Sequence, residues 1–120
     1  MALFGKKNKN TASSSSSGGN SHLNISVSNN GTEYTFTLEG RLDTITSPAL
    51  EAKINEVVGD ATKLILDLGS LDYISSAGLR VLLGAVQAME GKGDMVVRNL
   101  TQSVREVFDL TGFSNLFNIE

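Results

Sequence analysis

Two adjacent serines, Ser75 and Ser76, are the residues whose type and position most favour a chemical role. They follow the apolar run KLILDL, residues 63–68, and open the run SSAGLRVLL, which has helical spacing. A hydroxyl at the start of a helix can cap the free backbone N–H groups there. The same position can carry a phosphate, because those N–H groups and the helix dipole stabilise negative charge. Spacing alone leaves both capping and phosphorylation open.

Three aspartates, Asp43, Asp67 and Asp72, lie near the expected ends of strands. A Mg²⁺ or acid–base cluster is one interpretation, and capping in solvated loops is the other, which we favour. The chain has no Cys, its single His is His22, and it has no glycine loop of the phosphate-binding types. We therefore expect no catalytic residue, no metal and no cofactor, so that a serine would be the substrate of another enzyme.

Charge and composition limit the classes of partner. The net charge is −3, and three of the ten basic residues lie in the first 20, so 7 basic residues face 13 acidic ones from there on, a net of −6. An acidic domain argues against nucleic acid as the partner. No stretch approaches the roughly 20 apolar residues of a membrane span. We expect a cytoplasmic monomer without stable membrane association.

The chain divides into a tail and one domain. Residues 1–22 are rich in Ser, Gly and Asn, hold three lysines, and are expected to form a disordered tail. Residues 23–120 are long enough for one modest core. A short apolar and basic anchor at residues 3–7 is the sharper alternative for the tail, with marginal membrane affinity at best.

Apolar periodicity predicts the elements that must position the two serines. Alternating runs at 23–28 and 33–40 predict strands joined by a turn at Asn30-Gly31. A helix is expected from Ser47, which can cap it, to Gly59, and KLILDL is expected to be a strand buried on both faces. A helix from Ser76, a strand at 94–98, a helix capped by Thr101 and a strand at 116–119 complete the order β-β-α-β-α-β-α-β. This order predicts an α/β fold with a mixed sheet and helices packed on it.

Four segments together resemble one known family. GRLDTITSPAL, KLILDLGSLDYISSAGLRVLL, GDMVVRNL and VREVFDLTGFSNLFNI occur in this order over residues 23–119. In sequence and spacing they resemble the STAS domain of bacterial anti-sigma factor antagonists. Ser-Ser-Ala-Gly-Leu is the most specific part of the match.

The resemblance implies a partner-switching protein. Its dephosphorylated form would bind an anti-sigma factor that is also a serine-protein kinase, and so release a sigma factor. The kinase would phosphorylate the antagonist, and a PP2C-type phosphatase would reverse the reaction. The family acceptor falls on Ser76, with Ser75 as the alternative, because Ser75 stands where many members have Asp.

The expected partner surface combines a loop with a helix start. Asp43 and Thr44 follow the second expected strand, whereas Ser75, Ser76 and Gly78 follow the third, so parallel strands would bring them to one edge. Asp43 has no evident role in the core. Gly78 could permit close helix packing or the approach of a partner to the backbone.

Two alternatives remain beside this interpretation. The domain could be a STAS module that binds a sensor or scaffold without serine phosphorylation, or a small enzyme or nucleotide-binding protein. Phosphorylation by a cognate kinase would separate the first alternative from the switch.

Overall fold

The computed structural model describes residues 22–120, so the proposed tail at 1–22 lies outside the described residues except for His22. The described part contains one five-stranded sheet, three α-helices and one short 3₁₀ helix. The elements are β1 (Leu23–Asn30), β2 (Glu33–Leu42), α1 (Ser47–Val57), β3 (Lys63–Ile74), α2 (Ser76–Met89), β4 (Asp94–Arg98), α3 (Gln102–Thr111), η1 (Phe113–Asn115) and β5 (Asn118–Ile119).

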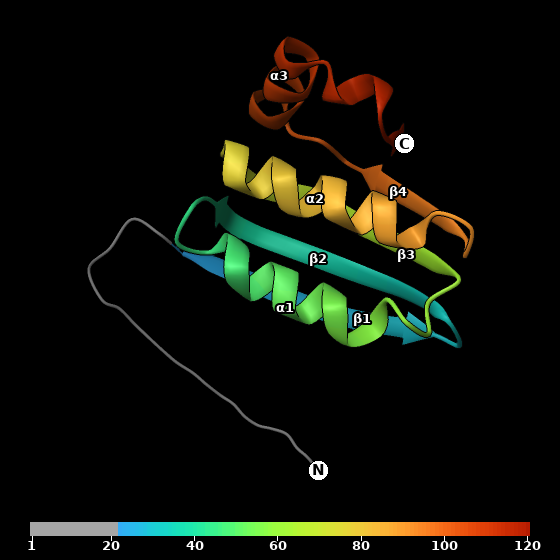
Figure 1. The fold of residues 1–120 in the computed structure, drawn as a ribbon. Helices are drawn as coiled ribbons and strands as arrows, with labels where there is room; N and C mark the ends of the chain where they lie inside the picture. The colour runs from blue at the N-terminus through green and yellow to red at the C-terminus, as the bar shows by residue number, and fades with distance from the viewer. Residues whose placement is uncertain (1–21) are drawn as a thin grey trace.

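The strands lie in the sheet in the order in which they occur in the chain, β1-β2-β3-β4-β5 (Figure 1). β1 pairs antiparallel with β2, and the later neighbours are all parallel. The pairing extends one residue before β1, since the carbonyl of His22 accepts the N–H of Arg41 at 2.7 Å. The expected mixed sheet is confirmed.

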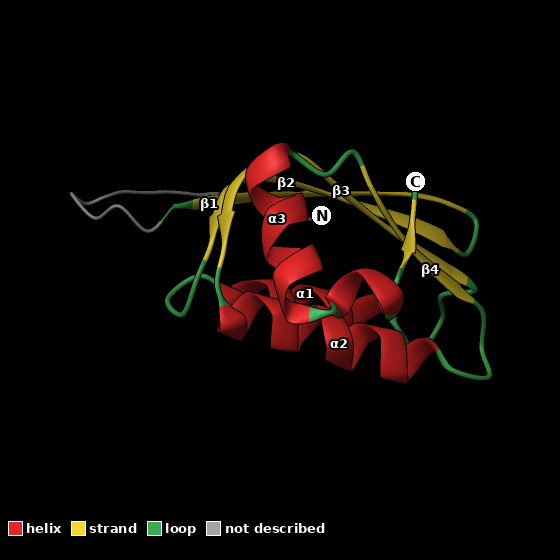
Figure 2. Ribbon diagram, turned by 90° about the horizontal axis from the view of Figure 1, so that it is seen from above, coloured by secondary structure: helices red, strands yellow, loops and turns green. Residues whose placement is uncertain are grey.

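The two longest helices, α1 and α2, cover the same face of the sheet (Figure 2). Leu64, Leu66 and Leu68 of β3 are buried, whereas Ile65 and Asp67 between them are partly exposed. Because successive strand residues point to opposite faces, the leucines face the helices. The expectation that this strand is buried on both faces was therefore wrong. Lys63 and Asp67 place two charged side chains on the opposite face of β3. These charges indicate that helices cover only one face of the strand.

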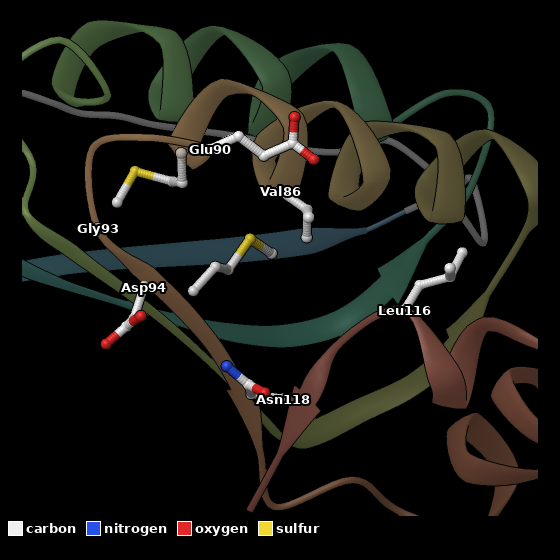
Figure 3. Close-up of a pocket in the computed structure, with 8 residues that line it drawn as sticks. Val86, Glu90, Gly93, Asp94, Leu116 and Asn118 are labelled. Atoms are coloured by element: carbon white, nitrogen blue, oxygen red, sulfur yellow. The ribbon is translucent and has the colours of Figure 1, made fainter.

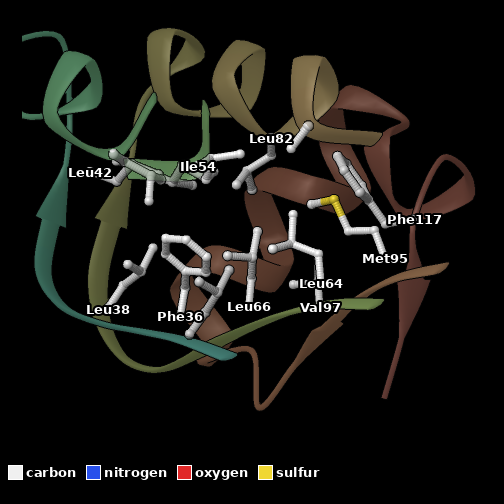
Figure 4. Close-up of a cluster of buried hydrophobic side chains, with 14 of the residues drawn as sticks. Phe36, Leu38, Leu42, Ile54, Leu64, Leu66, Leu82, Met95, Val97 and Phe117 are labelled. Carbon is white, nitrogen blue, oxygen red and sulfur yellow. The ribbon is translucent and has the colours of Figure 1, made fainter. Parts of the chain in front are cut away.

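The core fills the space between the sheet and its helices (Figure 4). Phe36 and Leu38 come from β2, Leu66 from β3 and Leu82 from α2, and all four are fully buried. Near the carboxyl end, Phe108 of α3 packs on Phe117 with ring centroids 5.5 Å apart. This aromatic contact holds α3 to the segment that leads into β5.

Local sequence signals explain most of the boundaries. Gly31, in the turn between β1 and β2, has φ 65°, which glycine adopts without strain. Thr101 caps α3 by accepting the N–H of Val104, and Gly112 ends that helix with φ 79°. The first helix differs from expectation. The cap position of α1 is Thr46, whereas Ser47 is the first residue of the helix. Ser47 is buried, and its hydroxyl donates to the carbonyl of Asp43.

β3 is longer than expected and β5 is shorter. β3 continues to Ile74, and two register shifts against β2 accommodate its extra residues. β5 has only two residues, because Leu116 and Phe117, which were expected to begin it, form a turn and a bend after η1. Among the described residues no helix has the length and apolar character needed to cross a membrane.

Candidate functional site

The strands β2 and β3 end side by side at one edge of the sheet. Leu42 pairs with Ile74 in parallel register, and one residue later the N–H of Ser75 donates to the carbonyl of Leu42 at 2.9 Å. This bond joins the start of α2 directly to the last residue of β2, after which the loop to α1 begins. We call the surface made by Arg41, the loop 43–46, Tyr73, Ser75 and Ser76 the Ser76 edge. Ser76 and the Asp43 loop thus lie at one place in the fold.

The two serines have different surroundings. Ser75 is the N-cap of α2, and its Oγ accepts the N–H of Gly78 at 3.3 Å. Ser76 is the first helical residue and is exposed. No hydrogen bond of its hydroxyl to another described residue is present. The geometry therefore gives the capping role to one serine and leaves the hydroxyl of the other accessible to solvent.

Asp43 organises the loop that follows β2. Its Oδ1 accepts the N–H groups of Ile45 and Thr46, both at 3.0 Å. The hydroxyl of Thr46 accepts the N–H of Asp43 at 2.9 Å and donates to the carbonyl of Arg41 at 2.8 Å. Asp43 is not among the core residues, but its carboxylate fixes the backbone of this loop, a local role that the sequence did not indicate. Thr44, the other residue predicted here, is exposed.

Arg41 links this loop to β3. Its guanidinium carbon lies 4.3 Å from the centroid of the Tyr73 ring, and its Nε lies 3.8 Å from Oδ2 of Asp43. Stacking of a guanidinium on an aromatic face is favourable because of the ring quadrupole. Tyr73 remains 40% exposed. A continuous set of contacts therefore runs from Tyr73 through Arg41 to the Asp43 loop.

Gly78 lies inside the domain. A Cβ at this position would come within 2.7 Å of Cγ of Leu42 and 3.0 Å of Cγ1 of Ile74. The residue is buried in the first turn of α2, where only a hydrogen atom fits against these side chains. Close packing of the helix on the strand ends explains a glycine here, and direct contact of Gly78 with a partner stays a prediction.

Asp67 lies in the interior of β3, because this strand extends to Ile74, whereas Asp72 lies near the end of the strand as expected. Oδ1 of Asp67 accepts the N–H of Gly69 at 3.0 Å, and its Oδ2 accepts the amide of Asn99 at 3.1 Å, with Nε of Arg98 3.6 Å away. Burial raises the pKa of Asp67, but these hydrogen bonds and the Arg98 charge outweigh it and lower the pKa below its ordinary value. Over residues 22–120, no group of three or more His, Cys, Asp or Glu side chains could hold a metal ion.

A pocket of about 180 Å³ lies away from this edge, at the carboxyl end of α2 (Figure 3). Val86 and Glu90 line it from α2, Asp94 from the start of β4, and Leu116 and Asn118 from the end of the chain. It is smaller than the roughly 300–1,000 Å³ of ordinary small-molecule sites. It contains none of the predicted site residues.

The Ser76 edge combines an exposed hydroxyl with an ordered loop. Sequence reasoning predicted Asp43, Thr44, Ser75 and Ser76 as contact residues but missed four further members of the Ser76 edge: Arg41, Ile45, Thr46 and Tyr73. Arg41 and Tyr73 become neighbours only through the β2–β3 register, which the two irregularities in β3 conceal. Ile45 lies between two threonines and belongs to no periodic pattern of apolar residues, so the sequence did not single it out. In the structure, 73% of its surface is exposed.

The mixed sheet with helices on one face, and a helix that starts beside the Asp43 loop, define a small α/β domain. The STAS domain family model matches residues 24–120, and the chain belongs to this family.

Several proteins similar to this chain are named anti-sigma factor antagonists. The proposed anti-sigma factor antagonist BtrV of Bordetella bronchiseptica is 43% identical over 84 residues, which cover 68% of this chain and 72% of BtrV. A solved anti-sigma factor antagonist of Mycobacterium paratuberculosis has a TM-score of 0.76 and 25% identity, covering 82% of this chain and 85% of that one. SpoIIAA of Bacillus, solved in its phosphorylated form, has a TM-score of 0.66 and 22% identity over 81% of this chain and 91% of its own, which shows a shared fold.

Proposed function

We propose that this protein is an anti-sigma factor antagonist whose binding is switched by phosphorylation of Ser76. In its dephosphorylated form it binds a serine-kinase anti-sigma factor in the cytoplasm and so frees a sigma factor. The kinase phosphorylates Ser76 with ATP, and a PP2C-type phosphatase restores the binding form. The chain itself is a binding module and substrate, without catalytic residues.

One observation carries the proposal: the exposed hydroxyl of Ser76 at the first position of α2, next to the loop ordered by Asp43. A phosphate there adds about −1.5 to −2 charges at pH 7 and meets the positive end of the helix dipole, so the helix can keep its structure. The domain is already acidic, with a net of −6 from residue 21 onward. Added negative charge at the Ser76 edge therefore disfavours an acidic or closely packed partner surface without unfolding the domain.

The capping role of Ser75 supports Ser76 as the acceptor. Its Oγ accepts the N–H of Gly78, so this hydroxyl would have to leave its capping position to reach the γ-phosphate of a kinase. Ser76 has no such bond to lose among the described residues.

The experiment uses the purified protein, its kinase and ATP, with the site mapped by mass spectrometry. Wild type and Ser75→Ala should both be phosphorylated, and Ser76→Ala should not. Calorimetry should then show tight binding of the kinase to the unmodified protein and at least about tenfold weaker binding to the phosphorylated form. Full phosphorylation of Ser76→Ala at Ser75 would move the acceptor. Tight binding of a sensor or scaffold, without any serine phosphorylation, would favour a STAS module without the switch.

A further inference from the structure

Ile45 is a large apolar side chain held out in water by an ordered loop. It is 73% exposed, although its backbone N–H donates to Asp43 and the next residue, Thr46, is fixed by bonds to both Asp43 and Arg41. The loop then enters α1 through the buried Ser47, whose N–H donates to the carbonyl of Asp43 at 2.9 Å. The position of Ile45 is therefore set before any partner binds, which lowers the ordering cost of binding.

A second exposed apolar group is connected to the same loop. Tyr73 lies under the guanidinium of Arg41, which in turn contacts Asp43. Five large hydrophobic side chains are exposed among residues 22–120, and these two belong to the Ser76 edge. The other three lie on β1, near the end of α3 and after η1 (Val27, Leu110 and Leu116). Single exposed apolar residues are ordinary on protein surfaces, but two linked ones beside an exposed serine indicate a contact surface.

The reach of the phosphorylating enzyme gives a further constraint. A kinase that modifies Ser76 must bring its γ-phosphate to the first turn of α2, and the N–H of Ser75 is bonded to Leu42, three residues before Ile45. The protein surface that surrounds the kinase active site must then meet the Asp43 loop as well. Partly buried apolar anchors next to polar contacts are the usual energetic centre of such interfaces.

We propose that Ile45 is the apolar anchor of the interface, and that the kinase carries an apolar pocket for it beside its phosphate-transfer site. This inference rests on the proposed function. Asp43 is a positioning residue for the anchor, since its carboxylate binds the Ile45 N–H. Tyr73 and Arg41 extend the contact along β3. The specificity for one kinase over another resides in the fit of this side chain as well as in Ser76.

The test compares the affinity of the purified kinase for four unphosphorylated proteins by calorimetry: wild type, Ile45→Val, Ile45→Ala and Leu110→Ala. Ile45→Ala should weaken binding by about tenfold or more, as loss of a buried aliphatic side chain does. Ile45→Val should stay within about threefold of wild type. Leu110→Ala removes an even more exposed side chain, at 87%, from α3 and should bind like wild type.

Two further measurements make each outcome decisive. The thermal midpoint of Ile45→Ala should equal that of wild type within about one degree, since the side chain has little buried area to lose. One outcome would overturn the role of Ile45 as the anchor but leave the proposed function intact. In that outcome the kinase binds wild type and Ile45→Ala equally well and does not bind Ser76→Asp. Equal weakening by Ile45→Ala and Leu110→Ala also overturns the anchor. If wild type itself fails to bind, the proposed function fails first.

Discussion

The neighbouring hydroxyls of Ser75 and Ser76 should respond differently to removal. Ser75→Ala deletes the cap of α2 and should lower the free energy of unfolding by about 0.5–2 kcal/mol. Ser76→Ala removes an exposed hydroxyl and should change it by less than about 0.5 kcal/mol. Urea denaturation of both variants beside wild type measures the difference. A larger loss for Ser76→Ala would give that serine a structural role.

Negative charge at Ser76 should not damage the fold. Ser76→Asp places a carboxylate at the first turn of α2, where the helix dipole stabilises it by about 0.3–1 kcal/mol. We therefore expect a thermal midpoint equal to or slightly above that of wild type, with an unchanged circular dichroism spectrum. A marked loss of midpoint would mean that weak binding by this variant reflects unfolding rather than repulsion.

Asp43 requires a different control, because its carboxylate also orders a loop within the domain. Asp43→Ala leaves the N–H groups of Ile45 and Thr46 without their acceptor, a loss similar to that of a helix cap and worth about 1 kcal/mol. Asp43→Asn keeps one side-chain oxygen as acceptor and should recover most of this stability. Unfolding measurements on both variants should precede any use of them in binding. Equal stability of Asp43→Ala and wild type would contradict the role of the carboxylate in the loop.

Within α2, two glycines provide a matched pair. Gly78→Ala forces a methyl against Leu42 and Ile74 and should destabilise the domain by about 1–3 kcal/mol, as overpacking does. Gly84 lies in the same helix with open space where a methyl would stand, so Gly84→Ala should stabilise by about 0.5–1 kcal/mol through helix propensity. Thermal unfolding of the two variants measures both signs. Stabilisation by Gly78→Ala would show that α2 can move away from the sheet at no cost.

Asp67, in β3, should make the free energy of unfolding depend on pH in the acidic range. Its pKa in the folded protein lies below the ordinary value of 3.8, so the unfolded chain takes up its proton first as pH falls. The stabilisation is present well above pH 3.8 and is lost as pH falls through the folded pKa. Wild type should therefore exceed Asp67→Asn in stability by more at about pH 7 than at about pH 3, by urea denaturation. A constant difference across this range would contradict the shift.

The helices and strands differ in how well local sequence patterns predict them. α3 has a capping threonine and a terminal glycine, and both act as expected. The second half of β3 could not be predicted, because the GSLD segment has turn composition and the register shifts break the alternation of a strand. The Ser76 edge was predicted in outline, since it needs only parallel strands. The contact of Arg41 with Tyr73 depends on that irregular register, which no local pattern in the sequence indicates.

At the scale of the whole molecule, the described residues contain a continuous apolar core. The buried apolar residues run from Phe36 to Phe117. A protein that consists of residues 22–120 should therefore fold with a thermal midpoint close to that of the full chain and bind the kinase with similar affinity. Differential scanning calorimetry and binding calorimetry on both proteins test this. A drop of several degrees, or about a tenfold loss of affinity, would assign contacts to residues 1–21.

The tight packing of Gly78 has a consequence for selection experiments. In a saturation library scored only by growth or reporter output, nearly every substitution at this position should be depleted, as at a binding hot spot. The depletion would arise from falling protein abundance, because the side chain has no room beside Leu42 and Ile74. Substitutions at Ile45 should instead lose output at unchanged abundance. Measuring both protein abundance and reporter output for each variant of the library would distinguish substitutions that destabilise the fold around the Ser76 edge from substitutions that weaken its contact with the partner.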